Sequence, residues 1–269
     1  VQNITDPDIV PYIPDGIGNS TDRQRIPAVL IIPGGAFRRL VYNFEGEDVA
    51  KWLNSMGIAA FVLECRLPSD EHDNAEDVPL IDAMRAMRVI RGRAQEFGID
   101  EAKIGVMGFS AGGFMAALLS TAYESDVYAD YKYKDEYDKL SARPDFAVCS
   151  YPVISIDDCI EAGKRYMSEE QVLERISDGK AKILHKYNPD KLVRPDMPPV
   201  FICETDDDRT TLSENSVGFY MAARKAGVSA ELHIFRTGGH GYGCGDDFAQ
   251  TGEWKVLFTK WIKSIGIIS

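Results

Sequence analysis

The chain has 269 residues and a formal net charge of −12, which disfavours a nucleic-acid partner because phosphate binding requires clustered Lys and Arg. No apolar run is long enough to span a bilayer, and the N-terminal VQNITDPDIV lacks the basic start and apolar stretch of a signal peptide. We therefore expect no membrane partner. The compartment stays open because a leader removed before residue 1 would leave no trace, but a cytoplasmic location is favoured.

Short apolar runs alternate with segments of helical periodicity along the chain. The runs are AVLII (28–32), IAAFVL (58–63), KIGVM (103–107), DFAVCSY (145–151), PVFIC (199–203) and AELHIF (230–235). The segments with helical spacing are 45–56, 78–97, 213–227 and 252–266. Most runs do not alternate apolar with polar residues, so both faces of each strand should be buried. The pattern predicts an α/β fold with a mostly parallel sheet and helices on both faces, formed as a single domain by residues 1–269.

Two charged segments interrupt this alternation, 122–144 and 156–196. One interpretation is that they form a small cap near the functional site, which in such folds lies at the carboxyl ends of the strands. The other is that each is a solvated surface excursion. The sequence does not decide between the two interpretations.

The sequence GFSAGG places Ser110 between glycines, after one apolar run and before another. Gly108 to Gly112 match the G-x-S-x-G pattern, in which a serine on a sharp turn between a strand and a helix is a nucleophile. A serine at such a junction can instead accept hydrogen bonds from the free N–H groups of the helix's first turn. The rest of the chain must decide between a nucleophile and a helix cap.

A serine nucleophile needs a histidine that takes its proton. Of the four histidines, His240 lies in GGHGYG, between the last apolar run and the C-terminal helical segment. Glycines on both sides permit a loop that brings the imidazole toward Ser110, so we predict that His240 is the general base. The other histidines are interpreted as surface or structural residues: His72, His185 and His233.

The histidine needs an acid that fixes its tautomer, and the oxyanion of the transition state needs backbone N–H donors. Three consecutive carboxylates, those of Asp206, Asp207 and Asp208, follow the run PVFIC and precede His240. One of them can orient the histidine, although an acidic cluster also suits the start of the next helix. The N–H after the serine, that of Ala111, is one expected donor, and the loop PGGAF (33–37) should supply the other.

The five cysteines give no indication of a metal site, because they are scattered and form no C-x-x-C pair or His/Cys cluster. Three lie in or at the end of apolar runs and are interpreted as small buried residues: Cys65, Cys149 and Cys203. We expect neither a metal nor an organic cofactor.

Nearly the whole chain resembles the acetyl xylan esterase-like group of esterases and lipases with the α/β-hydrolase fold. The resemblance is carried by AVLIIPGGAF with EGEDVAKWLNSMGIAAFVLECRLP, by IDAMRAMRVIRGRAQEFGIDEAKIGVMGFSAGG, and by MPPVFICETDDDRTTLSENS with AELHIFRTGGHGYG. By position it implies Ser110 as nucleophile, His240 as base, and Gly35 and Ala111 as oxyanion donors. The family pattern T-A-D-D-x-V-V-P-x-E-N-S aligns with TDDDRTTLSENS without a gap, which implies Asp208 as the acid, with Asp207 as the alternative.

The chain departs from the family pattern at several positions. Ala36 stands where a third glycine is usual, Cys65 where a tyrosine is, and Phe114 where a histidine often follows the serine turn. Residues 209–212 replace the apolar V-V-P turn, which leaves the position of the acid open.

The resemblance implies a serine esterase that hydrolyses short-chain carboxylic esters through an acyl-enzyme, with acetyl esters on carbohydrates as the expected substrates. One alternative is a serine peptidase of the same fold, although such enzymes usually carry an added domain that selects peptides. The other is a non-catalytic binding protein, which would normally have lost a member of the triad. The expected partner is a small-molecule ester, and whether the chain forms a homo-oligomer stays open.

Overall fold

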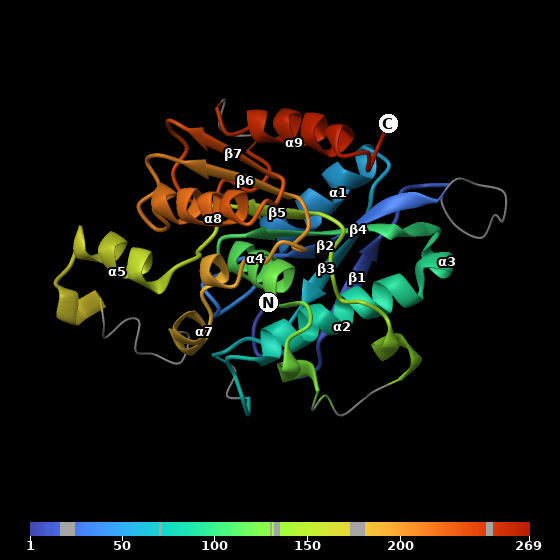
Figure 1. The fold of residues 1–269 in the computed structure, drawn as a ribbon, viewed down its shortest axis with the longest axis horizontal. Coiled ribbons are helices and arrows are strands. Elements are labelled where there is room, and N and C mark those ends of the chain that lie inside the picture. Colours follow the sequence, from blue (N-terminus) through green and yellow to red (C-terminus); the bar gives the residue numbers. More distant parts are fainter. Residues whose placement is uncertain (17–24, 70–71, 130, 132–134, 173–180, 246–249) are drawn as a thin grey trace.

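The structure is a computed structural model, and it describes residues 1–16, 25–69, 72–129, 131, 135–172, 181–245 and 250–269. Within these ranges, one seven-stranded sheet has the strand order β1-β3-β2-β4-β5-β6-β7 (Figure 1). The edge strand β1 pairs antiparallel with β3, and every other neighbouring pair is parallel. The strands are β1 (Asp8–Tyr12), β2 (Ile26–Ile32), β3 (Ala59–Glu64), β4 (Ile99–Phe109), β5 (Ala147–Ser150), β6 (Val200–Thr205) and β7 (Ala230–Phe235).

Both faces of the central strands are buried. In β2, Leu30 and Ile32 belong to the apolar cluster on one face of the sheet, whereas Val29 and Ile31 belong to the cluster on the other face. All four side chains are at most 1% exposed. Apolar residues are therefore required at successive positions, which explains why the runs in the sequence do not alternate.

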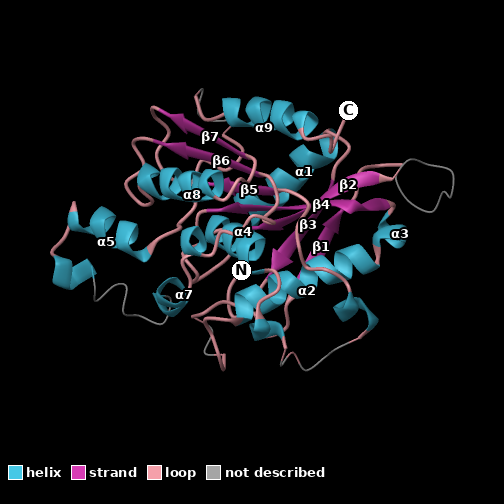
Figure 2. Ribbon diagram, in the orientation of Figure 1, coloured by secondary structure: helices cyan, strands magenta, loops and turns pink. Residues whose placement is uncertain are grey.

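Helices cover the two faces of the sheet (Figure 2). One face packs against α2 (Val78–Gly92), α4 (Ala111–Ala122) and α8 (Ser213–Lys225). The other packs against α1 (Asp48–Ser55), which follows the short π-helix η1 (Asn43–Glu47), and against α9 (Glu253–Ser264). The prediction of a mostly parallel sheet with helices on both faces is confirmed. The shorter helices are α3 (Ala94–Phe97), α5 (Ile156–Lys164), α7 (Ala181–Lys186), η2 (Asp126–Tyr128), η3 (Glu136–Lys139) and η4 (Pro189–Lys191).

The described part of the segment 122–144 lies along the outside of α2. Arg85 of α2 forms ion pairs with Asp135 at 2.6 Å and with Asp138 at 3.3 Å. The ring of Tyr137 packs over Gly92 at the end of the same helix, where an added Cβ would lie 2.3 Å from the ring. A helix that follows a parallel strand runs back from the carboxyl edge of the sheet, so these contacts place the segment away from that edge. The interpretation of this segment as part of a cap near the site is therefore wrong.

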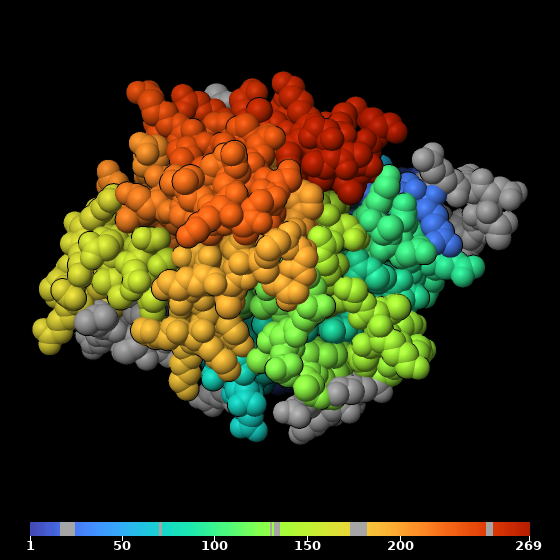
Figure 3. All heavy atoms as spheres, in the orientation of Figure 1, coloured from blue at the N-terminus to red at the C-terminus, as the bar shows by residue number. Residues whose placement is uncertain are grey.

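Residues 156–172, the first described part of the segment 156–196, lie at the carboxyl edge of the sheet, whereas Arg194 pairs with Glu124 at 3.0 Å just beyond the end of α4, away from that edge. The N–H groups of Ile154 and Ser155, just before α5, both donate to Asn215 Oδ1 at the start of α8, at 2.8 and 3.0 Å. The guanidinium of Arg209 lies over the ring of Tyr166, 5.9 Å from its centroid. In the space-filling view, the yellow atoms of this segment project from the molecule beside the orange atoms of α8 (Figure 3). Residues 156–172 are therefore the part of the two charged segments that is placed to form the small cap.

Candidate active site

Ser110 occupies the turn between β4 and α4 at the carboxyl edge of the sheet. Its backbone has φ 53° and ψ −118°, a conformation that non-glycine residues rarely adopt and that costs free energy. Its side chain makes no capping hydrogen bond to the described first turn of α4, so the helix-cap interpretation is wrong. Strained serines of this kind are typical of functional turns, where the surrounding structure holds them in place.

The glycines around Ser110 are required by the close approach of strand, turn and helix. A Cβ added at Gly108 would lie 1.9 Å from the carbonyl oxygen of Gly112. A Cβ added at Gly112 would lie 1.9 Å from the carbonyl oxygen of Ile32 in the neighbouring strand. Because both contacts are with backbone atoms, no side chain can be accommodated at either position.

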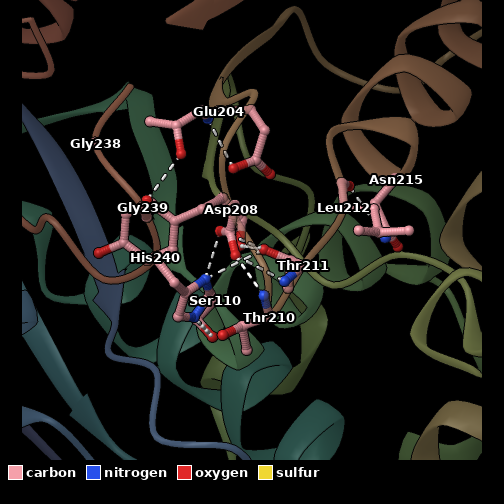
Figure 4. A network of polar contacts seen from close by, with 12 residues as sticks. Ser110, Glu204, Asp208, Thr210, Thr211, Leu212, Asn215, Gly238, Gly239 and His240 are labelled. Atoms are coloured by element: carbon pink, nitrogen blue, oxygen red, sulfur yellow. Dashed lines mark hydrogen bonds and ion pairs between the residues drawn. The ribbon is translucent and has the colours of Figure 1, made fainter. Parts of the chain in front are cut away.

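Ser110, His240 and Asp208 form a continuous chain of hydrogen bonds (Figure 4). His240 Nε2 lies 2.9 Å from Ser110 Oγ, and His240 Nδ1 lies 2.7 Å from Asp208 Oδ2. The three residues come from the ends of three different strands, since Asp208 follows β6 and His240 follows β7. The arrangement can move the serine proton to the imidazole while the carboxylate fixes the ring.

Asp208 is held as an ionised, buried acceptor. The residue is 3% exposed, and its Oδ1 accepts hydrogen bonds from the N–H groups of Thr210 at 2.7 Å and Thr211 at 3.0 Å. Burial alone raises the pKa of Asp208, but the hydrogen bond and charge of His240 and the two threonine N–H groups outweigh it. The net result is a pKa below the ordinary value for aspartate, so the carboxylate is charged at neutral pH.

The lowered pKa of Asp208 predicts how its contribution to stability depends on pH. A group whose pKa is depressed by folding stabilises the protein above its unfolded pKa of about 3.9, and this contribution is lost as pH falls through the folded pKa. The difference in free energy of unfolding between the wild type and Asp208→Asn should therefore shrink as pH is lowered from neutrality into the acid range. Urea unfolding at a series of pH values measures it, and a difference that grew in acid would contradict the proposed environment of Asp208.

Asp206 and Asp207 have other contacts. Asp207 Oδ1 accepts hydrogen bonds from the N–H groups of Gly238 at 2.9 Å and Gly239 at 2.8 Å, and so fixes the start of the loop that carries His240. The side chain of Asp206 is exposed, and its backbone N–H donates to the carbonyl of Phe235 at 2.8 Å. Of the three carboxylates, only that of Asp208 contacts the imidazole among the described residues.

Two residues beside Asp208 have contacts that were not predicted from the sequence. Thr211 Oγ1 lies 2.9 Å from Asp208 Oδ2 and 3.2 Å from His240 Nδ1. In the sequence, Thr211 was indicated only by the departure of residues 209–212 from the family's apolar turn. Glu204 is fully buried at the end of β6, where burial and the neighbouring charge of Asp208 raise its pKa well above the ordinary value. This direction is the one expected for a carboxyl group buried beside a second carboxylate.

The loop 33–37 lies against Ser110 with unpaired N–H groups. A Cβ added at Gly34 would lie 3.0 Å from Ser110 Cβ, which shows how closely the loop approaches the serine. Ala36, at the position of the family's third glycine, keeps a positive φ of 56°. Among the residues that the structure describes, the N–H groups of Gly35 and Ala111 have no hydrogen-bond acceptor. Both are available to a developing oxyanion.

The remaining predictions on histidines and cysteines agree with the structure where it bears on them. His72 Nε2 contacts the carbonyl of Ile4 at 3.0 Å, and His233 Nε2 contacts Glu231 Oε1 at 2.7 Å, so both have structural contacts away from Ser110. His185 lies in α7. The three cysteines in apolar runs are buried: Cys65, Cys149 and Cys203. Within the described ranges, no helix combines the length and apolar character required for a membrane span.

A mostly parallel sheet with a serine on a strained turn after a central strand, and with a histidine loop after the last strand, defines the α/β-hydrolase fold. The comparisons place the chain more narrowly within this class. The chain belongs to the BD-FAE family, whose sequence profile matches residues 17–222. The predicted resemblance to α/β-hydrolase esterases is confirmed.

Relatives with this fold are similar to most of the chain. It is 31% identical over 240 residues to an acetylxylan esterase of Xylanibacter ruminicola, covering 88% of this chain but only 45% of that protein. A crystal structure of an acetyl ester-xyloside bifunctional hydrolase from Caldicellulosiruptor lactoaceticus superimposes with a TM-score of 0.80 at 37% identity, covering 98% of this chain and 89% of that one. The esterase Est2 from Thermogutta terrifontis with bound propionate gives a TM-score of 0.75 at 25% identity, covering 98% and 91%. The chain thus spans less than half the length of the acetylxylan esterase that it matches.

Proposed function

We propose that the protein is a serine esterase that hydrolyses short-chain carboxylic esters, with acetyl groups on carbohydrates as its substrates. The observation that carries the proposal is the hydrogen-bonded chain from Ser110 Oγ through His240 to Asp208, close to the N–H groups of Gly35 and Ala111, which have no acceptor among the described residues. In the proposed roles, Ser110 is the nucleophile, His240 the general base and Asp208 the orienting acid.

The proposed reaction has two acyl-transfer steps. In the first, Ser110 Oγ attacks the ester carbonyl carbon, its proton passes to His240 Nε2, and the alcohol leaves with that proton. In the second, His240 takes a proton from water, the resulting hydroxide attacks the acyl-enzyme, and the proton returns to Ser110 as the acid is released. In both steps the N–H groups of Gly35 and Ala111 stabilise the oxyanion, and Asp208 keeps the Nδ1–H tautomer of His240.

Two lines of support bear on the substrate. The acetylxylan esterase of Xylanibacter ruminicola and the acetyl ester-xyloside hydrolase of Caldicellulosiruptor lactoaceticus are named for acetyl esters and xylose-based substrates, and both are more than 30% identical to this chain. A net charge of −12 is compatible with a neutral sugar and unfavourable for an anionic substrate. We therefore propose that the alcohol side of the ester is a neutral carbohydrate.

The reaction class is tested with a panel of three substrates. The purified protein should cleave p-nitrophenyl acetate and release acetate from acetylated xylan fragments, but it should leave a peptide anilide intact. Cleavage of the anilide at a rate comparable with the acetate ester would favour a peptidase. A folded protein that cleaves none of the three would favour a non-catalytic binding protein.

The packing beside Ser110 predicts a preference for short acyl groups. The space between the loop 33–40 and α4 is filled by Phe37 and Phe114, which meet edge to face with ring centroids 5.5 Å apart. Both rings are buried, and two relatives of this chain are named for acetyl esters. We expect kcat/KM for p-nitrophenyl esters to be highest for acetate or propionate and to fall with chain length. A maximum at octanoate or longer would contradict this prediction.

A further inference from the structure

Tyr151 contacts the histidine loop directly and the oxyanion loop through a buried carboxylate. It follows β5 directly, its side chain is fully buried, and its ring meets the imidazole of His240 edge to face with centroids 5.0 Å apart. Its hydroxyl accepts a hydrogen bond from the N–H of Gly243 at 3.0 Å, three residues beyond His240. The same hydroxyl donates to Glu45 Oε1 at 2.8 Å. The side chain of Tyr151 therefore contacts His240, the N–H of Gly243 in the same loop, and the buried carboxylate of Glu45.

The carboxylate of Glu45 connects this phenol to the oxyanion loop. Glu45 is 4% exposed in η1, and its Oε2 accepts a hydrogen bond from the N–H of Gly34 at 2.7 Å. On the other side of Gly34, its carbonyl oxygen accepts a hydrogen bond from the N–H of Val41 at 2.9 Å. Since the peptide bond is planar and trans, fixing the Gly34 carbonyl also directs the N–H of Gly35 to the opposite side. The loop's proposed donor is thus oriented by contacts on both sides of Gly34.

The backbone of Tyr151 has an unusual conformation that contacts with the surrounding structure stabilise. Its φ of 36° is unusual for a residue with a bulky side chain, and such conformations persist only where neighbouring contacts over-determine them. Its N–H donates to the carbonyl of Cys203 in β6 at 2.7 Å. Its carbonyl oxygen lies 3.3 Å from Thr211 Oγ1, beside Asp208. Tyr151 is consequently in contact with the loops of the acid and the base, and through Glu45 it is connected to the loop of the oxyanion donor.

We propose that Glu45 and Tyr151 are positioning residues that hold the oxyanion loop and the histidine loop at a fixed separation. With that separation fixed, the N–H of Gly35 and Nε2 of His240 act on the same substrate carbonyl. The proposal rests on the proposed esterase function and assigns no chemical step to either residue. Because transition-state stabilisation depends on preorganised geometry, a displacement of about 1 Å between the loops would cost about 100-fold in rate.

The chain offers a matched pair of substitutions for the test, Tyr151→Phe and Tyr242→Phe. Tyr242 is also fully buried, and its ring packs against that of Tyr151 with centroids 4.5 Å apart. Its hydroxyl lies beside the side chains of Cys203 and Ser150 but makes no hydrogen bond of ordinary distance and angle among the described residues. Each substitution removes one phenolic oxygen from the same aromatic cluster, but only Tyr151→Phe breaks the link between the two loops.

The measurement separates positioning from a loss of folded protein. Active sites are counted by titration with a p-nitrophenyl phosphonate, and kcat and KM are then expressed per titrated site. For Tyr151→Phe we expect kcat per site to fall about 10- to 100-fold with KM changed little, since the lost interactions matter in the transition state. The inhibition constant of a trifluoromethyl ketone, whose serine adduct is an oxyanion, should rise by the same factor. Tyr242→Phe should stay within about twofold of the wild type in both quantities.

Variants of Glu45 provide a second test that does not depend on the folding of Tyr151→Phe. Glutamine matches Glu45 in size, and its single amide oxygen can replace one of the two acceptor oxygens that Glu45 presents to Gly34 and Tyr151. Glu45→Gln keeps an acceptor for the N–H of Gly34 and should retain more activity than Glu45→Ala. Combining Glu45→Ala with Tyr151→Phe should add little to the loss from either alone, because both break one connected unit.

Several outcomes would overturn the proposal. Equal kcat per site and equal inhibition constants in Tyr151→Phe and Tyr242→Phe would do so. A loss confined to the number of titrated sites and to Tm would show a merely structural role and would also overturn it. The esterase mechanism is tested separately by Ser110→Ala. A folded Ser110→Ala protein with full activity would refute that mechanism, independently of the result for Tyr151→Phe.

Discussion

Ser110→Ala should lower kcat for p-nitrophenyl acetate by about 10⁴- to 10⁶-fold while the protein stays folded. The substitution removes the oxygen that attacks the carbonyl, and His240 Nε2 loses the hydroxyl that lies 2.9 Å away. Some catalysis above the rate in water should remain, because the N–H groups of Gly35 and Ala111 can still bind an oxyanion. Steady-state kinetics with circular dichroism on the same preparation measure both the loss and the fold.

Ser120→Ala is the matched control for this substitution. Ser120 lies on α4, the helix that follows Ser110. It is fully buried, and it donates its hydroxyl proton to the carbonyl of Ala116 at 2.7 Å. Its replacement removes the same atom and should cost about 1 kcal/mol of stability with no loss of kcat. A folded Ser110→Ala protein as active as Ser120→Ala would exclude Ser110 as the nucleophile.

The fold was predictable where burial determines the sequence. The strands β2 to β6 coincide with apolar runs because both faces of these strands are covered by helices, which demands apolar residues at successive positions. The edge strand β7 also coincides with a run, although its side chains are only partly buried. The antiparallel edge strand β1 has the sequence DIVPY, with a proline and partly exposed side chains, and gave no such run. The predicted helix 78–97 is interrupted at Arg93, where the backbone leaves helical geometry between α2 and α3. Local periodicity contains little information about such interruptions.

The candidate site was predictable only where a local pattern surrounds the residue. Ser110 and His240 lie among glycines that a tight turn and a loop require, so local sequence patterns indicated both residues. The Glu45–Tyr151 contact joins residues 106 positions apart, and the sequence around neither residue indicates that the other is its partner. The place of the segment 122–144 depends on its ion pairs with Arg85 on the outside of α2, which charge content alone does not reveal. Contacts of this kind are set by tertiary packing.

Asp208→Asn should lower kcat by about four orders of magnitude, the loss expected when an asparagine favours the wrong tautomer of the histidine. The carboxylate oxygen 2.7 Å from His240 Nδ1 accepts the Nδ1–H and leaves Nε2 free to take the serine proton. An asparagine held by the N–H groups of Thr210 and Thr211 through its Oδ1 would present its NH₂ group to Nδ1. Nδ1 would then be the acceptor, and the proton on Nε2 would prevent His240 from acting as the base.

Asp207→Asn is the control that decides between the two candidate acids, because the same change is made at the adjacent residue. Asp207 is exposed, and its Oδ1 accepts the N–H groups of Gly238 and Gly239. The Oδ1 of asparagine can accept the same two hydrogen bonds, so the histidine loop should keep its position and kcat should change by less than about threefold, as for a surface substitution. The ratio of kcat in the two variants is the measurement, with circular dichroism as the check on folding. A severe loss in Asp207→Asn with little effect in Asp208→Asn would show that the solution geometry of the loop 206–211 places the other carboxylate on His240 Nδ1.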